Sequence, residues 1–140
     1  MHRPRAIAMA IAAVGALLVA PAAANAATVT YEAENATISQ GAVNSDHAGF
    51  TGTGFVNYDN VTGSAVQWSV SVAAAGSTSL GFRFANGTTT ARPMTIAVDG
   101  TTVATPSFAG TGAWTTWTTT TVTATLTAGT HTVRDRKSVV

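Results

Sequence analysis

The sequence predicts an all-β domain, an antiparallel β-sandwich. After residue 27 the chain is rich in Thr, Val, Ala and Gly, and no stretch shows convincing helical periodicity. Thr and Val are stiff at χ1 and favour strands. Apolar and polar residues alternate in several short runs, and short alternating strands separated by Gly and Asn are typical of a sandwich.

Two segments show the alternation most clearly. Within 65–72 and 79–85 every second residue is apolar, so each segment is predicted to be a strand with one face in a core. The predicted inward-facing residues are Val66, Trp68, Val70 and Val72 in the first segment and Leu80, Phe82 and Phe84 in the second.

The second half of the chain predicts two tight turns. Asp99-Gly100 follows the apolar Ile96 and Val98, and this dipeptide readily supplies the positive φ angles of a hairpin turn. Alternation resumes within 118–134, with a turn at Ala128-Gly129 and a further strand from His131. The predicted inward-facing residues before that turn are Thr120, Val122, Ala124 and Leu126.

The first 26 residues are predicted to be a secretory signal peptide. They combine a basic start (His2, Arg3, Arg5), an apolar run over 6–20 and small residues before a cleavage point after Ala26. The run is too short and too Ala-rich for a confident membrane span, although a retained N-terminal anchor stays as an alternative. We therefore expect a secreted, extracellular protein with no membrane attachment after cleavage.

Charge indicates which partners are not expected, and cysteine content indicates what holds the domain together. Residues 27–140 hold five Arg and Lys against all six acidic residues, with no basic cluster, so nucleic acid is not an expected partner. The chain has no cysteine, so a small exported domain must be held together by its core and by any metal it binds. We expect a monomer.

The last six residues, 135–140, do not continue the alternation. Asp135, Arg136 and Lys137 stand together where a sandwich strand should still alternate, so this segment is interpreted as a non-native tail. We accordingly expect the natural chain to continue beyond Arg134 and the sandwich to lack its last strand here.

Glu32 and Glu34 are the first candidate site. Residues i and i+2 of a strand project from the same face, so the two carboxylates can meet at one point. Ca²⁺ accepts six to eight oxygen ligands, backbone carbonyls included, and would offset the repulsion. A solvated strand face explains the spacing equally well, and spacing alone does not decide between the two.

Two tryptophans fall outside the predicted core. Trp68 is in phase with the valines of its strand, whereas Trp117 is out of phase with its strand and Trp114 follows the loop-forming stretch 109–113. An exposed indole is costly unless it meets a flat, partly apolar partner such as a sugar ring. His47 and His131 are interpreted as surface residues, and no catalytic motif is present.

Together these stretches resemble the carbohydrate-binding modules of families 6 and 35, with family 35 the closer of the two. The resemblance rests on an ordered set of segments: YEAENA at 31–36, HAGFTGTGFVNYDN at 47–60, FRFANG at 82–87, ARPMTIAVDG at 91–100 and WTTWTTTTVTATLTAGTHTVR at 114–134. It implies a galactose-binding-like jelly roll over 27–134, incomplete at its end, that binds polysaccharide without catalysis and belongs to a secreted glycoside hydrolase or lyase.

The resemblance also implies particular site residues. It assigns a structural Ca²⁺ to Glu32 and Glu34 with a loop carbonyl near Gly52 and Thr53, and it places a further Asp ligand in a segment that would follow Arg134, so that the calcium site is incomplete in this chain. The same later segment would supply an Asn to the sugar site. The implied ligand-binding residues of this chain are Trp114, Trp117, Asn86, Arg92, Tyr58, Asp59 and Phe50.

Two other functions stay open at this point. One is a small hydrolase, which is disfavoured because it needs two carboxylates facing one cleft and Glu32 and Glu34 are already assigned to metal. The other is a structural or adhesive extracellular β-domain without a sugar ligand. Glycan titration separates binding from adhesion, and product release would reveal hydrolysis.

Overall fold

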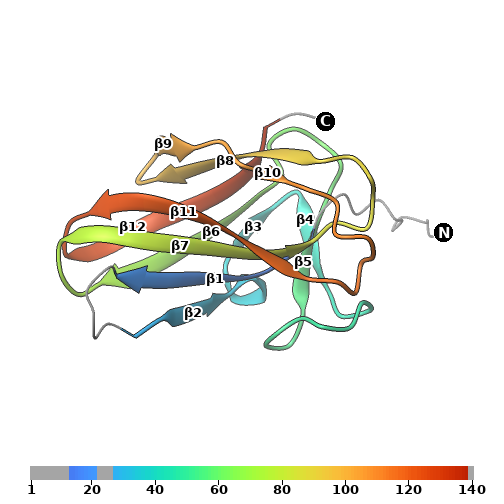
Figure 1. The fold of residues 1–140 in the computed structure, drawn as a ribbon, viewed down its shortest axis with the longest axis horizontal. Coiled ribbons are helices and arrows are strands. Elements are labelled where there is room, and N and C mark those ends of the chain that lie inside the picture. The colour runs from blue at the N-terminus through green and yellow to red at the C-terminus, as the bar shows by residue number, and fades with distance from the viewer. Residues whose placement is uncertain (1–12, 22–26, 139–140) are drawn as a thin grey trace.

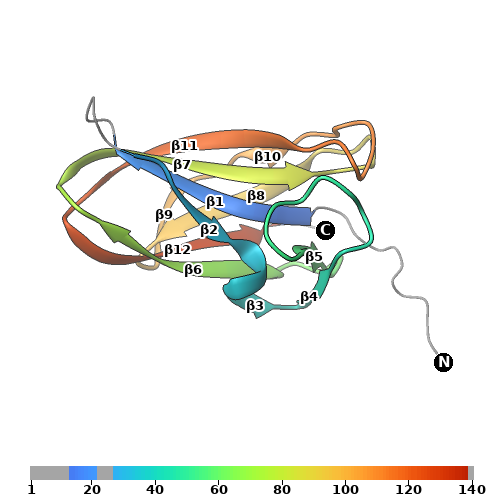
Figure 2. The ribbon, with the colours of Figure 1, turned by 90° about the horizontal axis from the view of Figure 1, so that it is seen from below.

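The fold consists of two antiparallel six-stranded sheets packed face to face, seen in a computed structural model that describes residues 13–21 and 27–138. Figures 1 and 2 show the two layers, with the longer strands running along the molecule. This confirms the predicted antiparallel β-sandwich.

The first sheet has the order β11-β7-β1-β5-β4, and β2 pairs with β1 beside β5. Its strands are β1 (Ala13–Pro21), β2 (Val29–Glu32), β4 (Gly41–Asn44), β5 (Phe55–Tyr58), β7 (Gly76–Ala85) and β11 (Thr118–Leu126). A 3₁₀ helix, Ala33–Asn35, follows β2.

The second sheet has the order β10-β8-β12-β6-β3, and β9 pairs with β8. Its strands are β3 (Thr37–Ser39), β6 (Ala65–Val72), β8 (Arg92–Val98), β9 (Thr101–Ala104), β10 (Ser107–Phe108) and β12 (Gly129–Lys137).

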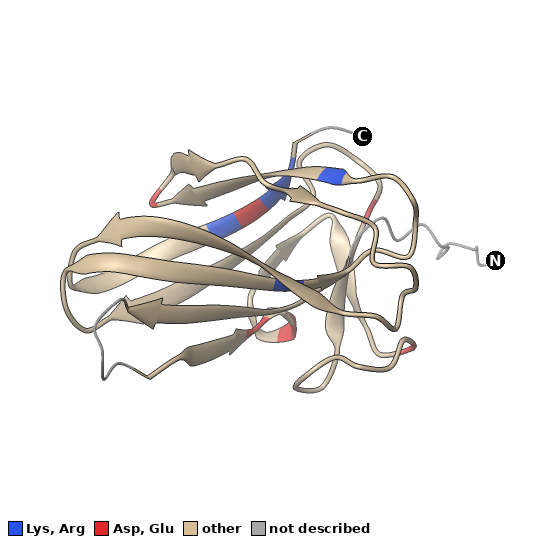
Figure 3. Ribbon diagram, in the orientation of Figure 1, with Lys and Arg blue, Asp and Glu red and all other residues tan. Residues whose placement is uncertain are grey.

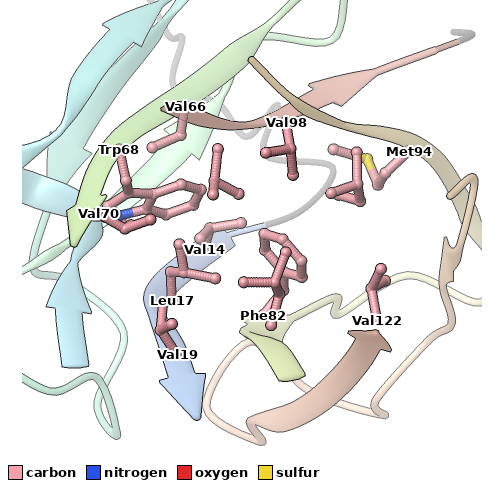
Figure 4. Packing of buried hydrophobic residues seen from close by; sticks show 14 of the residues in the cluster. Val14, Leu17, Val19, Val66, Trp68, Val70, Phe82, Met94, Val98 and Val122 are labelled. Carbon is pink, nitrogen blue, oxygen red and sulfur yellow. The ribbon is translucent and has the colours of Figure 1, made fainter. Parts of the chain in front are cut away.

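The core lies between the sheets and is built from the predicted alternation. All the predicted inward-facing residues of 65–72 and 79–85 are buried, Trp68 included at 3% exposed. Figure 4 shows Trp68 and Val70 of β6 facing Val14 and Leu17 of β1 across the interior. Both predicted turns are confirmed, with φ of 51° at Asp99, 83° at Gly100 and 121° at Gly129.

The position of β1 differs from the sequence-based boundary. Residues 13–21 lie within the predicted signal peptide, yet they form a central strand, while residues 1–12 and the cleavage point after Ala26 lie outside the described residues. An apolar run without alternation does not separate a signal peptide from a strand buried on both faces. The described fold therefore begins before residue 27.

The far end of β12 also differs from the prediction. The strand continues through Asp135, Arg136 and Lys137, paired with both β6 and β8, so its regular structure does not stop at Arg134. Asp135 and Lys137 point inward and are both 0% exposed. Figure 3 shows this charged run on the strand, in a molecule whose other charges are few and scattered.

Burial of Asp135 has electrostatic consequences. The Tyr58 hydroxyl donates a 2.8 Å hydrogen bond to Asp135 Oδ2, whereas Oδ1 is buried without a hydrogen-bond partner in the described part of the chain. Desolvation raises the pKa of Asp135 to about 7, with the hydrogen bond from Tyr58 opposing the rise. Burial likewise raises the pKa of Tyr58 and lowers that of Lys137.

His131 was predicted at the surface, and this is wrong. It is 8% exposed and links two turns, because Nδ1 lies 2.6 Å from Asp99 Oδ2 and Nε2 lies 2.8 Å from the Thr127 carbonyl. Both acceptors favour the imidazolium, so the bond to Asp99, followed by that to Thr127, raises the pKa of His131.

Candidate functional site

Five aromatic rings from two loops and β5 gather at one end of the sandwich. We call His47, Phe50, Phe55, Trp114 and Trp117 the aromatic cluster. Phe55 is its buried centre, with ring centroids 5.9 Å from His47, 5.9 Å from Phe50 and 5.7 Å from Trp117. In Figure 1 the loops that carry the cluster lie at the end opposite the β11–β12 turn.

Trp114 lies at the edge of the aromatic cluster and is half-buried. Its ring stacks on His47 at 6.0 Å with an interplanar angle of 19°. The indole also lies against Gly87, where a Cβ would overlap its ring atoms. The glycine thus lets a flat indole rest directly on the loop that follows β7.

Trp117 is held more firmly than Trp114. Its Nε1–H donates a 3.0 Å hydrogen bond to the Ala48 carbonyl, and the Arg83 guanidinium carbon lies 5.1 Å from its ring centroid. A Cβ on Gly15 would sit 3.2 Å from the same ring, so Trp117 packs on β1 as well. These contacts give Trp117 a structural role within the aromatic cluster.

Asn86 does not face the aromatic cluster as a free side chain. It is 0% exposed, and its amide NH₂ donates to the carbonyls of Thr90 and Phe108 at 2.9 and 3.0 Å. Its Oδ1 accepts from the Thr88 amide and hydroxyl. The amide therefore fixes the loop that carries Gly87, and the structure does not support a direct ligand contact for Asn86.

Three other predicted ligand residues lie apart from the aromatic cluster. Tyr58 is 1% exposed and bonded to Asp135, so its predicted place in the sugar site is corrected to the core. Asp59 is exposed, and its backbone organises the turn after β5 through Gln40 and Ser64. Arg92 starts β8 and lies near enough to Lys137 to contribute to that residue's lowered pKa, after desolvation. Of the seven predicted residues, the structure groups only Phe50, Trp114 and Trp117.

The carboxylates of Glu32 and Glu34 converge on one loop. The Thr51 hydroxyl donates to Glu32 Oε1 at 2.8 Å, and the Thr53 amide donates to Glu34 Oε2 at 2.7 Å. Gly52 lies between them with φ of 66°, and a Cβ there would overlap Glu34 Oε2. The expected local geometry is corrected, because β2 ends at Glu32 and Glu34 belongs to the 3₁₀ helix.

The family model for the carbohydrate binding module (family 35) matches residues 29–138. The chain belongs to this family. Modules of this family are non-catalytic, so the chain binds carbohydrate and is not itself an enzyme. The match extends through Ser138, which includes the charged end of β12.

The curated relatives of this family 35 module are much longer enzymes, and the module matches a short region of each. It is 55% identical over 107 residues to an exo-beta-D-glucosaminidase of Amycolatopsis orientalis, covering 76% of this chain and 10% of the enzyme. It is 38% identical over 96 residues to endo-1,4-beta-xylanase B of Cellvibrio japonicus, covering 67% of this chain and 16% of that enzyme. The chain therefore spans about a tenth to a sixth of these relatives.

Solved structures agree with the sequence match. A family 35 module from Clostridium thermocellum superposes with a TM-score of 0.76 at 42% identity, covering 78% of this chain and 85% of that one. A second, described as Xyl-CBM35 in complex with a disaccharide that contains glucuronic acid, gives a TM-score of 0.68 at 31% identity and covers 87% and 83% of the two chains.

Sequence reasoning missed three members of this region. His47 was interpreted as a surface residue, and neither Phe55 nor Arg83 was considered for the site. Alternation carried a signal for Arg83 alone, because it falls out of phase with Phe82 and Phe84 and so points away from the core. The positions of His47 and Phe55 depend on loop packing that periodicity does not encode.

Proposed function

We propose that the aromatic cluster is the sugar-binding site of this family 35 module and that Trp114 is its stacking platform. The observation that carries the proposal is a half-buried indole at the cluster edge, which packs against Gly87 and stacks on His47. A preformed, supported ring binds a sugar face with little loss of side-chain entropy.

Arg83 supports an acidic sugar as the ligand class. Its guanidinium lies over Trp117, and its Nη1 is buried without a hydrogen-bond partner among the described residues. Guanidinium groups bind carboxylates strongly. The solved relative with a glucuronic-acid disaccharide agrees with this choice.

The test is calorimetric titration of the chain with matched oligosaccharides. We expect a xylo-oligosaccharide with a glucuronic acid branch to bind more tightly than the unbranched one, with affinity falling as salt increases. Chitosan and mannan oligosaccharides complete the panel. Absence of binding across the whole panel would contradict the site, whereas equal binding of branched and unbranched ligands would contradict only the role of Arg83.

We propose, second, that Glu32 and Glu34 hold a structural Ca²⁺ together with the Thr53 carbonyl. Two facing carboxylates repel without a cation, and Glu34 Oε1 is buried without a hydrogen-bond partner in the described chain. The fit is partial, because no group of three or more acidic, His or Cys side chains occurs among residues 13–21 and 27–138. Carbonyls and water would have to complete the six to eight ligands that Ca²⁺ takes.

Removal of Ca²⁺ is expected to lower the melting temperature. A ligand that binds only the folded state at a hundredfold excess over its Kd contributes about 2.7 kcal/mol. Thermal unfolding in Ca²⁺ and after EDTA measures the loss, and Glu34→Gln should show a much smaller difference between the two conditions. An unchanged wild-type melting temperature would contradict the calcium proposal.

We infer that the module is exported and attaches a larger carbohydrate-active enzyme to its polysaccharide. The leader-like pattern of 1–26 and the presence of such modules in polysaccharide-acting relatives support this. The described part of the chain forms no helix long and apolar enough to cross a membrane. Detection of the protein in culture medium, with its N-terminus sequenced, tests export and the cleavage point together.

A further inference from the structure

Strand β1 is the sole hydrogen-bonded link between two parts of the first sheet in the described chain. On one side it pairs with β7 from Ala13↔Ala85 to Pro21↔Thr78, and on the other with β2 over four residue pairs and β5 over two. The sheet order is β11-β7-β1-β5-β4, so without β1 the β7–β11 pair and the β5–β4 pair lose their connection. Figure 2 shows β1 between β7 and β2.

The inward-facing side chains of β1 are buried in the core between the two sheets. Val14 and Leu17 are both 0% exposed and Val19 is 4% exposed. Figure 4 shows all three pointing from β1 into the space opposite Trp68 and Val70 of the second sheet. A shift in the β7 register between Val14 and Ala16 places Val14 and Leu17 on the same face although they are three residues apart.

The outer side of β1 connects it to both candidate sites. Gly15 lies beneath the Trp117 ring, where a Cβ would stand 3.2 Å from it. Ala16 lies directly opposite Glu32 in β2. The strand AVGALLVAP contains no charged or hydrogen-bonding side chain, which is what a central buried strand and the apolar core of an export signal both require.

We propose that the gap between β7 and the β2–β5 side is a strand-acceptor site for a short apolar peptide, and that the chain's own residues 13–21 fill it before any cleavage after Ala26. Docking and export therefore compete for the same segment. A leader that has docked as β1 is withheld from the export machinery. Cleavage after docking cuts the covalent link, but it leaves the peptide bound by its backbone hydrogen bonds and its three inward-facing side chains.

Cysteine cross-linking tests the register in the uncleaved chain, which has no native cysteine. Ser79 lies opposite both Ala20 of β1 and Thr123 of β11. Directly opposed residues have Cα atoms about 4.5–5.5 Å apart, within disulfide range. On oxidation, we expect the Ala20→Cys/Ser79→Cys variant to form its disulfide in the same yield as the Ser79→Cys/Thr123→Cys variant. The second disulfide joins β7 to β11 and does not involve the leader. Ala20→Cys/Thr123→Cys, about 10 Å apart across β7, should stay reduced.

A second measurement tests the acceptor site itself. A protease recognition site is inserted between Pro21 and Ala27, and the folded chain is treated with that protease. The products are then separated by size-exclusion chromatography. We expect the N-terminal peptide to co-elute with the module, and the matching Leu17→Asp chain to release it. Release from the parent chain, or no β1–β7 disulfide where the β7–β11 disulfide forms, would overturn the proposal. Neither readout involves sugar, so failure here is separate from failure of the glycan site.

Discussion

Replacing Trp114 with Ala is expected to abolish or greatly weaken glycan binding while leaving the sandwich folded. Trp114 lies in a loop at the edge of the aromatic cluster, outside the core between the sheets, and is half-buried. A Trp→Ala change in a core costs about 3–5 kcal/mol, and a loop position should cost much less. Titration with the branched xylo-oligosaccharide, beside a melting curve, separates the two effects.

Gly87→Ala is the matched variant that displaces the indole of Trp114 without removing it. The new methyl group would overlap the indole, and the ring must shift to relieve the contact. We expect weaker glycan binding with the melting temperature almost unchanged. If Trp114→Ala binds as wild type does, or melts far below it, Trp114 is not the platform.

Trp117→Ala provides a contrast with Trp114→Ala. Its indole is tied to the Ala48 carbonyl and to Arg83, and it packs on Gly15. Loss of that ring should therefore lower stability as well as binding. A Trp117 variant that melts as wild type but no longer binds would move the platform from Trp114 to Trp117.

Asp135→Asn is expected to remove a large part of the pH dependence of stability. Burial raises the pKa of Asp135 from 3.8 to about 7, and the carboxyl group is 0% exposed. Between these pH values the unfolded chain releases a proton that the folded chain retains, so wild-type stability falls as pH rises. The raised pKa of Asp135 therefore changes the free energy of unfolding by about 4 kcal/mol over this pH range, at about 1.4 kcal/mol per pKa unit.

The measurement is the stability difference between Asp135→Asn and wild type, from denaturant unfolding at pH 4 and pH 8. We expect the difference to move in favour of the Asn variant by about 4 kcal/mol between the two values. Asn cannot ionise and keeps a carbonyl oxygen as acceptor for Tyr58. A difference that stays constant with pH would show that Asp135 titrates normally.

His131 also contributes to the pH dependence, in the same direction. Its bonds to Asp99 and Thr127 raise its pKa, so its stabilising charge is present below 6.5 and is lost as pH rises through the folded-state pKa. This contribution is common to wild type and Asp135→Asn, and it cancels in their difference. His131→Gln measures it separately.

The amino-acid order alone was enough for the fold class, most strands and the family. Alternation placed Val66, Trp68 and Phe82 in the core, and Asp99-Gly100 marked its hairpin, because strand period and turn chemistry act between residues close in sequence. The spacing of Glu32 and Glu34 showed only that their carboxylates can meet, and it did not predict the 3₁₀ helix that orients Glu34.

The remaining features depend on contacts between distant residues. Trp117 meets Ala48 from 69 positions away, and Tyr58 meets Asp135 from 77, so neither partnership leaves a local pattern. The resemblance assigned Asn86 to the ligand site. In the structure its amide hydrogens are instead donated to the carbonyls of Thr90 and Phe108. The apolar run 13–21 fits a leader and a buried strand equally well, because both exclude water from the same side chains. Its place between β7 and β2 is set by the hydrogen-bonding edges of strands that follow it in the chain.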